Sequence, residues 1–286
     1  MSEPASAAGW LARAAAFLEE HDVPEPSANA EFLLAEVLGI GRGGLVLAGP
    51  RPLAAKQSRR YWELVKSRGR RLPLAYVLGW QPFAGCRIKV TPAVLVPRPE
   101  TEELVDLAVA EAKVLDRHPL HVVDVGTGSG CVAIALAKRL PDAQLYATDL
   151  SPAVLKLAEE NAVANHVSRR IRVVRENLFK PHAGSPWADM AVSNPPYIPT
   201  ADLAGLEPEV QAEPRLALDG GRDGLDALRA IAADAKRLVK PGGRLLLEFG
   251  DGQAGSVRGL LAEAGLTSIR IAADLQKKER FCVAVV

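Results

Sequence analysis

The chain has 286 residues, of which 48% are hydrophobic and 24% charged, and its formal net charge is +1. This length suffices for one large domain or two ordinary ones, and the composition is that of a folded globular protein. A net charge so close to zero excludes a global electrostatic field that recruits nucleic acid. Since no apolar run is long enough to cross a bilayer either, we expect no stable nucleic-acid complex and no membrane association.

The cysteines and histidines show no metal-binding or redox pattern. Cys86, Cys131 and Cys282 lie far apart, and the five histidines are equally dispersed. Close spacing is what identifies a metal knuckle or a redox pair. We therefore expect no metal and a reducing, cytoplasmic setting. Arg13 interrupts the Ala-rich stretch near the N-terminus, which does not have the apolar core of a signal peptide.

Residues 1–80 are predicted to form a small helical domain. Ser27 can cap the second helix, which we expect to end before Gly39. This domain shows no catalytic constellation, so it is either a partner-docking domain or a packing appendage. For the arginines at 59–60 and 68–71, a solvated helix face is favoured over a phosphate-binding patch. Helical spacing relates Trp10, Ala14, Phe17 and Leu18, then Leu33, Leu34, Val37 and Leu38, then Tyr61, Leu64 and Val65.

Residues 81–99 are predicted to form a hinge that contains a β-hairpin. Ile88 and Val90 alternate as in a strand, and Gly and Pro punctuate the segment. A helix should then open at Glu100, because acidic residues are favourable at the positive end of a helix.

Residues 100–286 are predicted to form an α/β domain with a doubly wound, mostly parallel, seven-stranded sheet. Apolar runs alternate with helical stretches, and repeated β-α units give a parallel sheet with helices on both faces. The last two strands lie too close together for a helical crossover, so they should pair antiparallel. The expected strands are 121–125, 144–148, 171–174, 188–192, 244–249, 268–272 and 281–286.

A glycine-rich loop follows the first of these strands and enters a helix. Its glycines permit a tight turn and let ligand atoms approach free main-chain N–H groups at the helix start. The spacing G-x-G-x-G differs from the dinucleotide fingerprint. The candidate cofactor-binding residues of this loop are Gly126, Thr127, Gly128, Ser129 and Gly130.

The next two strands end in further candidate ligand-binding residues. Asp149, about 20 residues beyond the loop, can accept hydrogen bonds from two ribose hydroxyls; the alternative is a helix cap before Ser151. Asn177 and Leu178 follow the third strand, where an adenine would lie in such a sheet; the alternative is a loop turn.

The most distinctive stretch is Asn194-Pro195-Pro196-Tyr197, which follows the apolar run 188–192. Both proline φ angles are fixed and the residues before them are biased to extended geometry, so the rim is stiff. The Asn194 amide oxygen and the Pro195 carbonyl can then converge on a planar NH2 group, with the Tyr197 ring beside it. The alternative is a rigid turn with no chemical role.

Together, the glycine loop, Asp149 and the Asn194–Tyr197 tetrapeptide resemble the class I, Rossmann-like S-adenosylmethionine-dependent methyltransferases. The tetrapeptide resembles the signature of enzymes that methylate planar NH2 groups on DNA adenine, RNA guanine or protein glutamine. The resemblance implies that Asn194, Pro195, Pro196 and Tyr197 are catalytic and bind the substrate, that Asn194 also contacts the cofactor, and that no metal takes part.

Further stretches are similar to the release-factor-specific protein-(glutamine-N5) methyltransferases: 73–79, 96–102 and 213–221. This resemblance implies methylation of the glutamine in the Gly-Gly-Gln motif of class 1 peptide release factors, with release of S-adenosylhomocysteine. We expect the protein to be a cytoplasmic monomer. Two departures concern the substrate mouth: Ala212 stands where an aromatic is common, and 276–279 lack a common glycine. The alternatives are a nucleic-acid amino-methyltransferase and a non-catalytic cofactor-binding module.

Overall fold

The computed structural model describes residues 6–176 and 185–286. The chain forms two compact units, one reaching to Gly79 and including Glu207–Ala212, the other made of Trp80–Leu206 and Glu213–Val286. The first boundary falls next to the predicted one at residue 80. The inclusion of 207–212 shows that the first unit also takes a short segment from the loop that follows the tetrapeptide.

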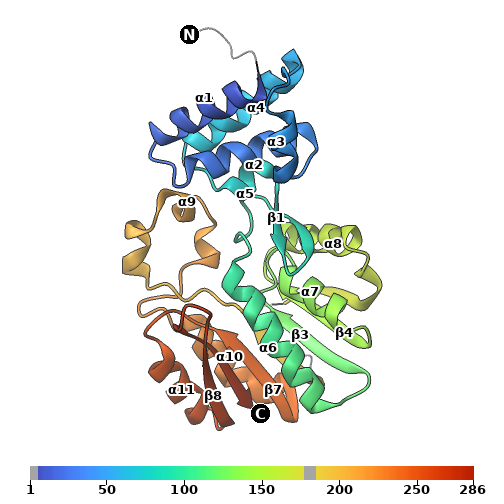
Figure 1. The fold of residues 1–286 in the computed structure, drawn as a ribbon. Helices are drawn as coiled ribbons and strands as arrows, with labels where there is room; N and C mark the ends of the chain where they lie inside the picture. The colour runs from blue at the N-terminus through green and yellow to red at the C-terminus, as the bar shows by residue number, and fades with distance from the viewer. Residues whose placement is uncertain (1–5, 177–184) are drawn as a thin grey trace. The chain divides into compact units, whose positions relative to one another are not determined.

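The first unit is helical, as the sequence predicts (Figure 1). Trp10, Leu18, Leu33 and Tyr61 are at most 4% exposed, so the helical spacing identified the buried faces correctly. The Tyr61 hydroxyl donates to the Ala30 carbonyl at 3.1 Å, which satisfies it within the core. The helices are α1 (Ala7–Glu19), α2 (Pro26–Leu38), α3 (Leu45–Ala48), α4 (Ala55–Gly69), α5 (Leu74–Leu78) and α9 (Pro208–Gln211).

The ends of α2 confirm one prediction and correct another. Gly39 ends the helix in the left-handed conformation, with φ of 65°. Ser27 is not the cap, because α2 begins one residue earlier at Pro26 and Glu25 occupies the cap position. Proline is well suited to the first turn, where its missing N–H has no partner to lose.

Arg68 corrects the prediction of a solvated arginine face. It is 3% exposed and donates to Asn29 Oδ1 at 2.7 Å and to Glu209 Oε1 at 2.8 Å. Arg71 forms a two-pronged ion pair with the same carboxylate, at 2.7 Å to each oxygen. The Glu209 carboxylate thus binds α9 to the arginines at the end of α4, while Arg59 and Arg60 are exposed.

The second unit begins with the predicted hairpin, continues with α6 from Pro99, and contains a seven-stranded sheet. Its strands are β1 (Trp80–Phe83), β2 (Cys86–Lys89), β3 (Leu120–Val125), β4 (Ala143–Asp149), β5 (Ile171–Arg175), β6 (Ala188–Ser193), β7 (Val239–Glu248), β8 (Thr267–Ala273) and β9 (Glu279–Val285). Its helices are α6 (Pro99–Leu115), α7 (Cys131–Arg139), α8 (Pro152–Ala164), α10 (Asp226–Leu238) and α11 (Ala254–Glu263).

The large sheet has the strand order β5-β4-β3-β6-β7-β9-β8. Strands β3 to β7 are parallel, and β9 pairs antiparallel with both β7 and β8, so the predicted terminal hairpin is confirmed. The chain moves outward from β3 to β5 and then returns to the other side of β3 at β6. This reversal of strand order is the point where open α/β sheets bind ligands.

Side chains that alternate along the strands divide the sheet into two faces. Val123 and Val125 pack into a cluster with residues of α10 and α11. Their neighbour Asp124 points the other way and accepts a hydrogen bond from Ala133 in α7. Because successive side chains of a strand face opposite sides, Asp124 lies on the face opposite α10 and α11. Helices α6, α7 and α8 cover that face (Figure 1).

The turn between β8 and β9 forms without the glycine that the resemblance leads us to expect within 276–279. Lys277 adopts the left-handed conformation at φ 65°. Asp274 organises the turn by accepting hydrogen bonds from the main chain of Gln276 and Lys278 and from Arg280, each at 2.9 Å. These bonds offset the strain of a side chain at positive φ.

The Glu209 ion pairs should stabilise the helical unit. We expect Glu209→Gln to lower the free energy of unfolding by about 2 to 3 kcal/mol, because a buried guanidinium loses its counter-charge. Burial raises the pKa of Glu209, but hydrogen bonds from Arg71 and Arg68 outweigh this and hold it below its ordinary value. The stabilisation is therefore present at neutral pH and lost as the pH falls through that depressed pKa. Urea denaturation measures it, with exposed Glu19→Gln as the control; equal losses in both variants would refute this account.

Candidate active site

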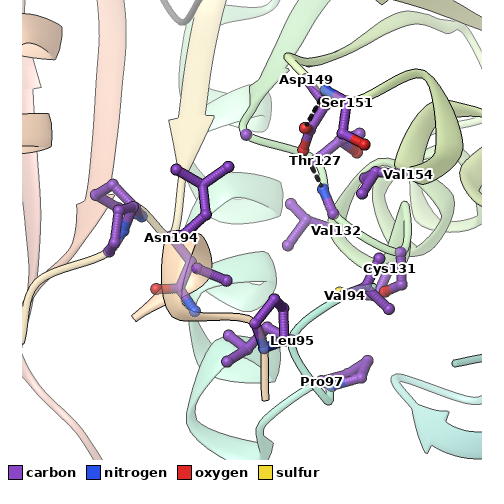
Figure 2. A pocket seen from close by; sticks show the side chains of 18 of the residues that line it. Val94, Leu95, Pro97, Thr127, Cys131, Val132, Asp149, Ser151, Val154 and Asn194 are labelled. Carbon is purple, nitrogen blue, oxygen red and sulfur yellow. Dashed lines mark hydrogen bonds between the residues drawn. The ribbon is translucent and has the colours of Figure 1, made fainter. Parts of the chain in front are cut away.

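A cavity of about 260 Å³ lies at the carboxyl ends of β3, β4 and β6. Figure 2 shows Asn194 on one side of it, with Asp149 and Ser151 on the other. The lining therefore unites the two stretches that the sequence identified, the glycine loop and the tetrapeptide. It also includes Ala93, Val94, Leu95, Pro97, Arg98, Thr101, Val132, Val154, Pro214, Leu216 and Ala217.

The glycine loop lines the cavity with main chain. Gly126, Gly128 and Gly130 have φ of 71°, 54° and 83°, a region that side-chain-bearing residues rarely adopt. Thr127 N–H donates to the Thr148 carbonyl at 2.8 Å, which ties the loop to β4. The glycines therefore serve the turn itself, as predicted.

Asp124, the penultimate residue of β3, fixes the glycine loop through buried hydrogen bonds. It is 2% exposed, and its Oδ2 accepts from Thr127 Oγ1 at 2.6 Å and from Ala133 N at 3.1 Å. Burial raises the pKa of Asp124 to about 6 in spite of these two bonds. The carboxyl group thus connects the loop with the first turn of α7.

Asp149 connects the loop with the start of α8. Its Oδ2 accepts from Gly128 N and its Oδ1 from Ser151 N, both at 3.1 Å. Ser151 occupies the cap position of α8, so Asp149 is not the cap that the alternative interpretation required. Each carboxylate oxygen retains acceptor capacity, and the residue lines the cavity. The predicted Asn177 and Leu178 lie outside the described residues.

The tetrapeptide leaves β6 directly, as predicted. Ser193 Oγ donates to the Val125 carbonyl at 2.7 Å, which fixes the exit of β6 to that of β3. Asn194 is half-buried, and its Nδ2 donates to Thr101 Oγ1 at 3.0 Å. Pro195 and Pro196 line the cavity beside it.

Tyr197 has its hydroxyl in a buried environment. The hydroxyl donates to Glu248 Oε1 at 3.4 Å, and burial together with that carboxylate raises the Tyr197 pKa. Gln253 Nε2 donates to the Tyr197 carbonyl at 2.9 Å, which fixes the end of the tetrapeptide. The ring packs against the cluster formed with α10 and α11. Its expected place against a substrate amide stays a prediction.

The loop that follows the tetrapeptide returns to the cavity through a buried glutamate. Glu213 is 5% exposed and accepts from Val96 N at 2.9 Å and from Arg98 at 2.5 Å. Arg98 and the adjacent Pro214 both line the cavity. This ion pair holds together two stretches on which the resemblance depends.

Sequence reasoning did not assign roles to Asp124, Thr101, Glu213 and Glu248. Thr101 and Glu213 belong to the stretches 96–102 and 213–221, and Asp124 lies in the strand just before the glycine loop, so the positions of all three carried a signal. Glu248 ends β7, and the only available signal was an acidic residue at the end of an apolar strand. Such a residue is a candidate functional group, because carboxylates are rarely buried unless they are paired or belong to a functional site.

No three His, Cys, Asp or Glu side chains within residues 6–176 and 185–286 are grouped so as to hold a metal ion. Among the helices that the structure describes, none is long and apolar enough to cross a membrane.

Fold and cavity have the arrangement of a methyltransferase, and the family comparison agrees: residues 109–205 match the model of the methyltransferase small domain. Residues 9–79 match the model described as the PrmC N-terminal domain. A methyltransferase from Pyrococcus furiosus shares the fold, with a TM-score of 0.52 and 17% identity over 70% of this chain and 89% of that one.

Relatives from two bacteria identify the family. The release factor glutamine methyltransferase of Geobacter sulfurreducens is 43% identical over 90% of this chain and 89% of its own length. That of Gloeobacter violaceus is 41% identical over 99% of this chain and 97% of its own. The chain therefore belongs to the release factor glutamine methyltransferase family.

Gly130 should tolerate a side chain less well than Gly128. A Cβ at Gly130 would lie 3.1 Å from Ala158 Cβ, whereas nothing lies within 4 Å of one at Gly128. Both positions have positive φ, so the difference isolates the packing conflict. We expect Gly130→Ala to cost about 1 to 3 kcal/mol more in unfolding free energy than Gly128→Ala, as overpacking does. Thermal unfolding of the two ligand-free variants measures this, and equal destabilisation would show that only the backbone angle matters.

Proposed function

We propose that this protein transfers a methyl group from S-adenosylmethionine to the side-chain amide nitrogen of the glutamine in the Gly-Gly-Gln motif of class 1 peptide release factors. The observation that carries the proposal is the single cavity lined by both the glycine loop and Asn194. Membership of the release factor glutamine methyltransferase family supports the choice of acceptor. The coproduct is S-adenosylhomocysteine.

The residues of the loop side fit this cofactor. Positive-φ glycines let a ligand approach the main chain, and the Asp149 oxygens retain acceptor capacity for two ribose hydroxyls. Apolar Val132 and Val154 line the same cavity and suit the faces of an adenine. S-adenosylmethionine supplies an electrophilic methyl group when bound.

The tetrapeptide side fits a planar amide. Asn194 Oδ1 and the Pro195 carbonyl accept the two N–H bonds of the substrate amide, so its nitrogen is oriented with the lone pair toward the methyl donor. An N–C bond would form as the bond from sulfur to methyl breaks and S-adenosylhomocysteine leaves, and the nitrogen would then release one proton to water. Holding the two hydrogens lowers the barrier by orientation and by stabilising positive charge as it develops on nitrogen.

We propose further that the protein acts as a monomer in the cytoplasm, without a metal and without a stable nucleic-acid partner. Free, buried Cys86, Cys131 and Cys282 suit a reducing compartment. Arg68 and Arg71, which were candidates for phosphate contacts, are instead paired with Glu209. The exposed arginines Arg59 and Arg60 keep nucleic acid among the substrates to be tested.

The proposal is tested by transfer of labelled methyl from S-adenosylmethionine to a purified, unmethylated release factor. We expect label on the wild-type factor and none on a factor whose Gly-Gly-Gln glutamine is replaced by alanine. RNA and DNA are offered in parallel. Label on nucleic acid alone would overturn the substrate while preserving the methyltransferase assignment.

Asn194 should contribute mainly to turnover, and Asp149 mainly to cofactor binding. We expect Asn194→Ala to lower kcat by about 100-fold or more, as loss of a transition-state hydrogen bond does, with a far smaller change in the Kd for S-adenosylmethionine. Asp149→Asn should raise that Kd by about 10-fold or more, because hydrogen bonds to a charged group are lost. Calorimetric titration gives Kd and the methyl assay gives kcat. Comparable losses of both quantities in Asn194→Ala would contradict this division.

A further inference from the structure

A buried hydrogen-bond network lies directly behind the tetrapeptide. Glu248, the last residue of β7, is 0% exposed, and Thr101 in the first turn of α6 is 2% exposed. Thr101 Oγ1 and Glu248 Oε2 are 2.8 Å apart, and Asn194 Nδ2 lies 3.0 Å from the same Oγ1. The other carboxylate oxygen of Glu248 accepts from the Tyr197 hydroxyl. One carboxylate thus contacts both ends of the tetrapeptide, directly at Tyr197 and through Thr101 at Asn194.

The position of Glu248 follows from the sheet. β6 and β7 pair in parallel, with Ser193 opposite Leu247. The next residues along the two strands are Asn194 and Glu248, so the register brings both to the same edge. Leu247 packs with α10 and α11, and side chains alternate along a strand. Glu248 therefore points to the face of α6, where Thr101 lies.

The chemistry of the three groups fixes the direction of each bond. An ionised carboxylate only accepts, and a threonine hydroxyl has one hydrogen. Thr101 must use that hydrogen on Glu248, so its oxygen is left to accept from Asn194. The Asn194 amide consequently turns its NH2 group to Thr101 and leaves its carbonyl oxygen for a ligand. In the opposite orientation, Asn194 would turn its own NH2 group toward the substrate NH2. Two donor groups cannot hydrogen-bond in this way, so they would repel each other.

We propose that Glu248 and Thr101 are positioning residues that set the orientation of the Asn194 side-chain amide, and so make this site selective for an acceptor that carries an NH2 group. The inference rests on the proposed function and deepens it. Neither residue needs to touch the substrate for this role, because the direction is transmitted through one hydroxyl.

The same argument gives the site a dependence on pH. Burial raises the pKa of Glu248 to about 7, and nearby Glu100 adds to the effect, whereas bonds from Thr101 and Tyr197 and the charge of Arg280 oppose it. Cys131, on α7, also interacts electrostatically with this carboxylate, and burial raises the pKa of its thiol to about 12, so it stays neutral. Once protonated, Glu248 can donate to Thr101, whose hydroxyl is then free to donate to Asn194 Oδ1. The fixed orientation is present above that pKa and lost as the pH falls through it.

The test compares Thr101→Val, Thr101→Ser and Glu248→Gln in the methyl-transfer assay. We expect Thr101→Val to lower kcat by about 10-fold or more, with the Kd for S-adenosylmethionine within about twofold of wild type, as loss of one orienting hydrogen bond predicts. Thr101→Ser keeps the hydroxyl and should recover most of the rate. Wild-type kcat should fall on the acid side of about pH 7, following Glu248. Glu248→Gln should be slower and should lack this acid limb.

Asp189→Asn is the matched control for a buried carboxyl. Asp189 is 1% exposed and lies at the opposite end of β6, where it binds Arg117, Lys240 and the main chain of His121. We expect this variant to lose thermal stability and to keep the wild-type kcat and pH profile. If its kcat falls as far as that of Glu248→Gln, general loosening of the sheet explains both, and the inference is overturned.

A readout without turnover separates the inference from the proposed function. The Asn194 side-chain NH2 signals in a nitrogen-15 NMR spectrum, assigned with Asn194→Ala, should shift with a midpoint near pH 7 in the wild type and stay constant in Glu248→Gln. If the wild type methylates no release factor but this titration is present, the orientation network survives and only the substrate assignment fails. Unchanged kcat in Thr101→Val, or an unchanged titration in Glu248→Gln, would refute the network itself.

Discussion

The parallel pairing of β3 with β6 is the constraint on which the rest of the catalytic unit depends. Asp124 lies opposite Val192, and Ser193 extends the pairing by one more hydrogen bond to Val125. Because the strands run in the same direction, the glycine loop after β3 and the tetrapeptide after β6 emerge at one edge. About 70 residues of chain separate the two motifs, and this pairing closes that loop. Any shift in the register would move both motifs relative to each other and separate the two sides of the cavity.

The alternation of side chains along these central strands then separates packing from chemistry. Val123, Val125 and Leu247 pack under α10 and α11 and form an apolar core. Asp124 and Glu248 point to the other face, where α7 and α6 supply a main-chain N–H and a hydroxyl. Burial raises the pKa of Asp124 to about 6 and that of Glu248 to about 7, so neither carboxyl contributes to stability as a core leucine would. Their hydrogen bonds explain their positions: Asp124 fixes the glycine loop and Glu248 fixes the tetrapeptide.

The sequence predicted what is local and periodic, and it did not predict what is distant and polar. The strands, the glycine loop and the place of Asn194 follow from short-range patterns that the chain repeats clearly. The ion pair of Arg68 with Glu209 spans 141 residues, and the bond of Thr101 with Glu248 spans 147. No periodicity relates such partners, because their meeting depends on topology and register. For the same reason the sequence pattern favours a solvated Arg68, whereas the structure buries this side chain beside Glu209. The error at Ser27 is smaller: two adjacent residues competed for the start of a helix, and proline determined where it begins.

The rigidity around Asn194 has a physical rationale in the proposed reaction. An amide nitrogen shares its lone pair with the carbonyl, so it is a poor nucleophile, and in the proposed reaction no base is needed beforehand because the nitrogen becomes acidic only once it is methylated. What the chain can supply is orientation, which is effective only if the acceptors are held in place beforehand. Two prolines fix the main chain and Gln253 holds the Tyr197 carbonyl. Thr101 leaves the Asn194 amide a single favourable direction. Each of these restraints loses conformational entropy when the protein folds, so that little remains to be lost when a substrate amide binds.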